Sequence, residues 1–173
     1  MDKRNKGMDI TRVAYCALFT TLALILSYVE SKIPAPVPVP GVKLGLANLA
    51  IIMVLYVYSW KEALLVSVLR IFLSSLLFGT AITLSFSLAG GFVSLLVMIV
   101  LKKTNLFPLM GVSMIGGVAH NFGQMVVAVF MVQTLSLGYY FAILMITGAL
   151  TGLVIGYVGG LALKTLKKVM IRR

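Results

Sequence analysis

The chain has 173 residues, of which 61% are hydrophobic, and its mean hydropathy of +1.09 lies far outside the range of soluble proteins. Its net charge of +11 would favour nucleic-acid binding in a soluble protein, but here the basic residues are divided among short segments beside apolar runs. These properties predict an integral membrane protein with one domain, residues 1–173, and exclude nucleic acid as a partner.

Six apolar runs predict six helices, each near the ~20 residues that a bilayer requires. In chain order, the expected helices cover about 10–30, 43–58, 61–78, 82–101, 108–134 and 138–163. The predicted fold is therefore an all-α bundle of six transmembrane helices.

The basic residues predict the orientation of this bundle. Twelve of the fifteen lie in the N-terminal tail, in alternate loops or after the last helix: Lys3, Arg4, Lys6, Arg12, Lys61, Lys102, Lys103, Lys164, Lys167, Lys168, Arg172 and Arg173. Positive charge beside membrane spans marks the cytoplasmic face, so we expect both termini to be cytoplasmic. Anionic membrane lipids are the expected counter-charge.

A proline-rich segment, residues 31–42, joins the first two expected helices and lies outside by the same charge rule. Pro34, Pro36, Pro38 and Pro40 alternate with other residues, which favours an extended polyproline II conformation. The segment is either a stiff connector or a lid over an external pocket.

The last expected helix carries glycines at every fourth position: Gly148, Gly152, Gly156 and Gly160. Residues four apart share a helix face, so these glycines allow another backbone to approach closely. Close packing within the bundle is one interpretation, and docking of a separate membrane subunit is the other. Ala17 and Thr21 form a smaller pair of this kind on the first helix.

Polar residues inside the spans are few, and such residues usually mark a pocket, a pathway or a structural pair. At ~1.5 Å rise per residue, Arg70 lies near mid-bilayer, and His120 and Gln124 lie in the outer half. Asn121 adjoins this pair. These positions predict a pocket that opens outward.

Lys43 and Asn48, near the start of the second expected helix, would contribute to the same pocket. Arg70, Lys43 and the free amide groups of that helix favour negative charge. The expected ligand is a hydrophobic molecule with an anionic or strongly polar head.

Structural roles remain as alternatives. In the first alternative, the polar residues of the fifth helix form only interhelical hydrogen bonds. In the second, Arg70 pairs with Glu30, with Glu62 or with carbonyl groups at helix ends. We expect Glu30, at the end of its helix, to be solvated.

The composition disfavours catalysis. Four carboxylates in total cannot form the aspartate-rich clusters that magnesium–diphosphate chemistry requires. One histidine, His120, and one cysteine, Cys16, exclude a multi-histidine or multi-cysteine metal centre. We expect no catalytic residues, no bound metal and no cofactor.

Four segments together resemble the "Gx transporter" family, whose members are often labelled heptaprenyl diphosphate synthase component I. The segments are Pro34 to Asn48, Leu69-Arg70 with Leu76-Leu77-Phe78-Gly79, Ser87-Leu88-Ala89-Gly90-Gly91, and Gly116 to Gln124. The family is similar to the S components of energy-coupling factor transporters. These are six-helix bacterial membrane proteins with both termini inside.

The resemblance implies that the chain binds a small molecule from outside, beneath the loop between helices 1 and 2, and works with a transmembrane coupling subunit and two ATPases. S components commonly carry two alanines four residues apart on helix 1 for docking, whereas this chain has Ala17 and Thr21. The ligand classes considered are an isoprenoid or quinone precursor and a flavin-like vitamin. The alternative is a non-catalytic membrane accessory of polyprenyl diphosphate or menaquinone synthesis.

Overall fold

The computed structural model describes residues 10–33, 45–133 and 138–171, and within these ranges it contains six helices and no strand. The helices are α1 (Ile10–Lys32), α2 (Asn48–Val57), α3 (Trp60–Phe78), α4 (Ala81–Thr104), α5 (Leu109–Val132) and α6 (Gly138–Ile171). The predicted all-α fold is therefore confirmed at the level of a six-helix bundle.

Two helices differ clearly from their expected bounds. α6 continues to Ile171, well beyond the expected end at 163, and α2 begins at Asn48 rather than at 43. The later start of α2 follows from Gly45, which has a left-handed φ of 86° and accepts a 2.9 Å hydrogen bond from the Asn48 amide. Lys43 and most of the proline-rich segment 31–42 lie outside the described residues.

Local sequence accounts for several of the other helix ends. Ser59 caps α3, and Thr80 forms a capping box with Thr83 at the start of α4. Asn105 ends α4 with a left-handed φ of 54°, and Pro108, which suits the beginning of a helix, precedes α5.

Among the described residues, four helical segments are long and apolar enough to cross a membrane: Ile10–Lys32, Ala81–Thr104, Leu109–Met131 and Phe141–Leu166. α2 has only 10 residues, which span about 15 Å, half the ~30 Å hydrocarbon core. α3 has 19 residues and carries the charged residues Lys61, Glu62 and Arg70. The chain is therefore a multi-pass helical membrane protein.

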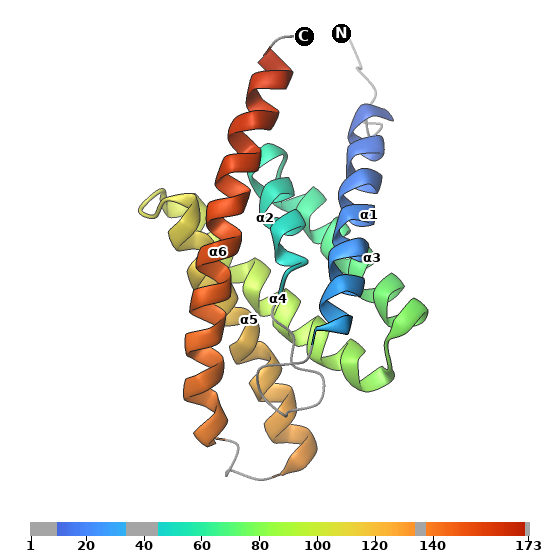
Figure 1. The fold of residues 1–173 in the computed structure, drawn as a ribbon, viewed down its shortest axis with the longest axis vertical. Helices are drawn as coiled ribbons and strands as arrows, with labels where there is room; N and C mark the ends of the chain where they lie inside the picture. The colour runs from blue at the N-terminus through green and yellow to red at the C-terminus, as the bar shows by residue number, and fades with distance from the viewer. Residues whose placement is uncertain (1–9, 34–44, 134–137, 172–173) are drawn as a thin grey trace, which may run out of the picture.

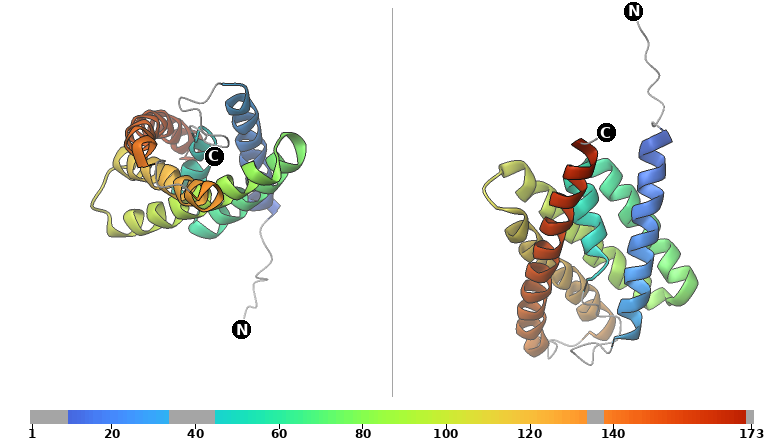
Figure 2. Two further views of the ribbon diagram at one scale, coloured as in Figure 1. Left: turned by 90° about the horizontal axis from the view of Figure 1, so that it is seen from below. Right: turned by 45° about the horizontal axis from the view of Figure 1, so that its top comes forward.

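The helices form two groups joined by α4 (Figure 1). α5 packs most extensively against α6 and α4, while α1 packs against α3. α2 lies between the groups and contacts α1, α3, α4 and α6. Figures 1 and 2 show α4 crossing obliquely from the α3 side to the α5 side of the bundle.

The start of α1 and the end of α6 lie at the same end of the bundle (Figure 1). The α2–α3 turn and the α4–α5 turn lie at this end too, which collects the described basic residues Arg12, Lys61, Lys102, Lys103, Lys164 and Lys168. We refer to it as the basic end. The opposite end carries Lys32.

The main apolar core surrounds α2, whose Ala50, Ile52 and Val54 are completely buried. A second cluster, made by Phe86, Met125, Ala128 and Leu144, fills the space between α4, α5 and α6. Many large apolar side chains face outward instead, including Leu76, Phe130 and Ile146. Such an exposed apolar surface suits lipid rather than water.

The α6 glycines mostly serve packing within the chain. A Cβ atom on Gly152 would lie 2.6 Å from the Ser113 carbonyl oxygen, and one on Gly156 would lie 2.8 Å from the Met110 Cα atom. Only a missing side chain allows α5 to approach this closely. Gly160 is different, because a Cβ there would meet nothing within 4 Å among the described residues.

Candidate functional site

Arg70 lies halfway along α3 and is buried, with 3% of the residue exposed. It lies against α4, where a Cβ atom on Gly91 would be 3.8 Å from Arg70 Nη2. Within the part of the chain that the structure describes, Nε and Nη2 of Arg70 are buried without a hydrogen-bond acceptor. Buried guanidinium donors without acceptors carry a desolvation cost, so their presence here requires an explanation.

Glu30 is the carboxylate whose charge acts on Arg70. It lies at the end of α1, is 5% exposed and accepts a hydrogen bond from the Gly45 backbone amide. The expectation that Glu30 is solvated was wrong, because the turn at Gly45 covers its carboxylate. Glu62 lies elsewhere, 3.8 Å from Arg12 and hydrogen-bonded to the Ser59 hydroxyl.

His120 and Gln124, one turn apart on α5, both face Gly90 of α4. A Cβ on Gly90 would lie 2.9 Å from His120 Cε1 and 2.9 Å from Gln124 Cγ. His120 is 3% exposed and Gln124 is fully buried. Gly90 lies beside these two α5 side chains, and the next residue, Gly91, lies beside Arg70. The α5 side chains and Arg70 therefore pack against the same short segment of α4.

Asn48, the first residue of α2, completes the group. A Cβ on Gly45 would lie 3.2 Å from Asn48 Nδ2 and 3.9 Å from His120 Cδ2. Four predicted residues thus gather in the interior, and we call these four with Glu30 the polar cluster. Its members are Glu30, Asn48, Arg70, His120 and Gln124.

Asn121 lies on a different face of α5. Its amide nitrogen donates a 2.6 Å hydrogen bond to the Leu144 carbonyl oxygen of α6 and lies beside Gly148. The interhelical hydrogen bond considered from the sequence is therefore present at Asn121. Lys43, the remaining predicted site residue, lies outside the described residues.

Sequence reasoning named Glu30 as a possible partner of Arg70 but did not place it in the site, and it did not recognise the role of Gly90 and Gly91. Two features of the sequence pointed to them. Glu30 is the acidic residue of the first long apolar run, and Gly90-Gly91 interrupts a run of good helix formers, where glycine costs about 1 kcal/mol unless close packing requires it.

The two small-residue surfaces considered for docking differ in exposure. Gly148, Gly152 and Gly156 are buried against α5, whereas Ala17 and Thr21 are exposed on α1. The Thr21 hydroxyl donates a 3.0 Å hydrogen bond to the Ala17 carbonyl oxygen, so it is satisfied within its own helix. Thr21 therefore behaves as a small residue with no need of a polar partner.

The polar cluster offers guanidinium, imidazole and amide groups together with one carboxylate, which is a set suited to binding a polar group. No three His, Cys, Asp or Glu side chains in the described ranges are grouped so as to hold a metal ion.

The long apolar helices and the buried cluster between them define a multi-pass helical membrane protein with a polar interior site. The family model for heptaprenyl diphosphate synthase component I matches residues 19–162, so the chain belongs to this family, as its motifs predicted. The searches of curated proteins and of solved structures give no match.

Proposed function

We propose that this chain is the substrate-binding membrane subunit of an uptake system for a small organic molecule, of the energy-coupling factor S-component type. Separate ATPase subunits would drive transport. The ligand is a hydrophobic molecule with an anionic or strongly polar head, such as an isoprenoid or quinone precursor or a flavin-like vitamin. The chain itself performs no catalysis and requires no cofactor.

The unsatisfied donors of Arg70 are the observation that carries this proposal. Glu30 offers an opposite charge, but Nε and Nη2 of Arg70 still have no acceptor among the described residues. A phosphate, carboxylate or carbonyl group bound there would satisfy them, and such charge-assisted hydrogen bonds are among the stronger ones in proteins. A purely structural arginine would instead be expected to have its donors satisfied.

The position of the polar cluster supports capture from outside. Glu30 lies at the end of α1 remote from the basic end, and Asn48 begins α2 on the same side. If the basic end is cytoplasmic, as its charge predicts, the cluster is nearer the external face. The exposed Ala17 and Thr21 on α1 would offer a docking surface for the coupling subunit.

Native mass spectrometry of the gently extracted protein tests both ligand and partners. Arg70→Ala should reduce ligand retention at least about thirty-fold, because truncating a buried charged group in a hydrogen-bonded pair costs 2 kcal/mol or more. His120→Ala should reduce it about ten-fold. Arg12→Ala is the matched control, since it also removes one arginine, but an exposed one at the basic end.

Normal retention in both cluster variants would show that the ligand binds elsewhere. Co-purification separates the remaining alternative: ATPase subunits indicate the transporter, whereas a soluble prenyl synthase indicates a membrane accessory of polyprenyl diphosphate or menaquinone synthesis. Magnesium-dependent product formation by this chain alone would contradict the non-catalytic role.

A further inference from the structure

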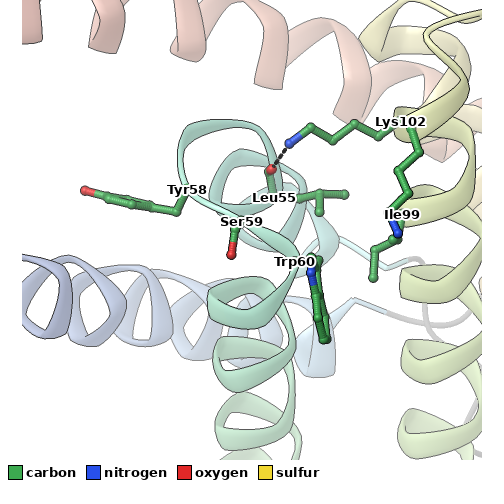
Figure 3. Close-up of a pocket in the computed structure, with 7 residues that line it drawn as sticks. Leu55, Tyr58, Ser59, Trp60, Ile99 and Lys102 are labelled. Atoms are coloured by element: carbon green, nitrogen blue, oxygen red, sulfur yellow. Dashed lines mark hydrogen bonds between the residues drawn. The ribbon is translucent and has the colours of Figure 1, made fainter. Parts of the chain in front are cut away.

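A cavity lies at the basic end, between the α2–α3 turn and the last turn of α4 (Figure 3). Its volume is about 180 Å³. The lining residues are Leu55, Tyr58, Ser59, Trp60, Ile99, Lys102 and Lys103. We refer to it as the basic-end pocket, and no part of the polar cluster contributes to it.

Two ammonium groups make this pocket cationic. Lys102 Nζ donates a hydrogen bond to the Leu55 carbonyl oxygen and lies 5.0 Å from the centroid of the Tyr56 ring (Figure 3). An ammonium group has three N–H donors, so the bond to Leu55 leaves two. Lys103 is exposed beside it. Both charges come from the end of one long apolar helix.

The opposite wall also favours an anion. Ser59 caps α3, so the first turn of that 19-residue helix directs its amide groups and the positive end of its dipole toward this region. The Tyr58 side chain points away from Lys102 (Figure 3) and packs on Tyr15, with 5.8 Å between the two ring centroids, so Tyr58 contributes to this wall without aiming its hydroxyl at Lys102. Trp60, 44% exposed, adds the amphipathic ring that is common at membrane interfaces.

Glu62 is the nearby acidic group, and it does not line this pocket. Its carboxylate accepts from the Ser59 hydroxyl and faces Arg12, with 3.8 Å between Glu62 Oε1 and Arg12 Nη1. It belongs to a neighbouring cavity that also contains Arg12. The basic-end pocket therefore has two lysines and no carboxylate in its lining.

The surface below the pocket is apolar along one face of α4. Phe92, Leu96 and Val100 are 58%, 48% and 59% exposed, and their spacing places them on the same helix face as Lys103. A lysine at the end of such an apolar stripe matches an anionic lipid, with the phosphate at the lysine and the acyl chains along the helix.

We propose that the basic-end pocket binds the phosphate group of an anionic phospholipid whose acyl chains lie along Phe92, Leu96 and Val100. The proposal is independent of the uptake function, because it involves neither the polar cluster nor the docking surface on α1. It assigns Lys102 and Lys103 to a defined lipid site rather than to general attraction by the basic end.

The test compares retention of phosphatidylglycerol and phosphatidylcholine by native mass spectrometry of protein released from nanodiscs containing both lipids. Lys103→Gln should reduce phosphatidylglycerol retention about five-fold and leave phosphatidylcholine unchanged, since one lysine at the surface contributes about that factor. Lys164→Gln is the matched control, because Lys164 is exposed on α6 at the same end and does not line the pocket. It should have no effect.

Lys102→Gln provides a second variant, with an equal or larger loss of phosphatidylglycerol expected. This variant is secondary because Lys102 also donates a hydrogen bond to the Leu55 carbonyl oxygen near the end of α2. The thermal unfolding of the Lys102 variant must therefore be measured in parallel. Equal losses in the Lys103 and Lys164 variants would mean general charge attraction and overturn the site. Loss of a co-purified protein without loss of phosphatidylglycerol in the Lys103 variant would also overturn it.

Discussion

Two regions of this protein contain buried polar side chains whose hydrogen bonds are satisfied to different degrees. At the α4–α5–α6 contacts, Asn121 donates to the Leu144 carbonyl oxygen and the Ser94 hydroxyl donates to the Gly116 carbonyl oxygen over 2.8 Å. At the polar cluster, two donors of Arg70 have no acceptor in the described ranges. Residue type alone therefore does not separate a structural polar group from a binding one.

Glycine is used differently in the two regions as well. Gly152 and Gly156 of α6 face backbone atoms of α5, so their role is to bring two helices close together. Gly90 faces the side chains of His120 and Gln124, and Gly91 faces Arg70 and Ile71, so this pair makes room for side chains of the polar cluster. The first region is a packing surface, and the second is where we propose the binding site.

The largest effect is expected at the packing surface. Gly152→Val should lower the free energy of unfolding by about 3 kcal/mol, because the added Cβ would meet the Ser113 carbonyl oxygen and the Met114 Cα atom, which cannot move without shifting α5. Thermal unfolding in detergent measures this loss. Gly160→Val is the control, with an expected change within about 0.5 kcal/mol. Equal effects of the two variants would show that α5–α6 contact is not what makes Gly152 sensitive.

A smaller effect is expected in the glycine pair of α4. Gly90→Ala should destabilise the fold by about 1–2 kcal/mol, since overpacking against the His120 carbonyl oxygen exceeds the gain in helix propensity, and it should lower ligand retention. Gly91→Ala meets mainly the flexible end of Ile71 and should change stability by about 0.5 kcal/mol or less. Normal ligand retention in Gly90→Ala would show that Gly90 is not part of the binding site.

Asn121 and His120 are neighbours in sequence, and they should respond differently to truncation. Asn121→Ala should lower stability by about 1 kcal/mol through loss of the bond to Leu144 and leave ligand retention unchanged. His120→Ala should do the reverse, with lower retention and a similar unfolding temperature. Unfolding curves and native mass spectra of both variants test this difference. Loss of ligand in Asn121→Ala would show that Asn121 belongs to the binding site after all.

The smallest effect on stability is expected on the exposed face of α1. Ala17→Leu should change the free energy of unfolding by less than about 0.5 kcal/mol and yet reduce co-purification of a coupling subunit. Ala142→Leu, the same change on the exposed face of α6, should leave co-purification intact. A partner retained by Ala17→Leu would place the docking surface elsewhere.

Much of the fold followed from the sequence because hydrophobicity and charge act locally. Apolar runs of membrane length predicted the helices, and the exposed apolar residues of the structure agree with a lipid environment. The separation of basic residues to one end was predicted from the loops that carry them. The length of α2 was less predictable, since a positive φ at Gly45 shortened it within an apolar stretch.

The sequence by itself determined which residues are unusually polar for the membrane interior. It therefore identified Arg70, His120 and Gln124 as residues whose position in a span requires a structural or functional explanation. It could not determine which face of each helix points into the bundle, because nearly every position in the spans is apolar and hydrophobic periodicity then carries no information. Only the tertiary structure turned Asn121 toward α6 and His120 toward Gly90, and only the turn at Gly45 buried Glu30 near Arg70. These side-chain orientations and the burial of Glu30 depend on close contacts between helices distant in sequence, which local composition does not encode.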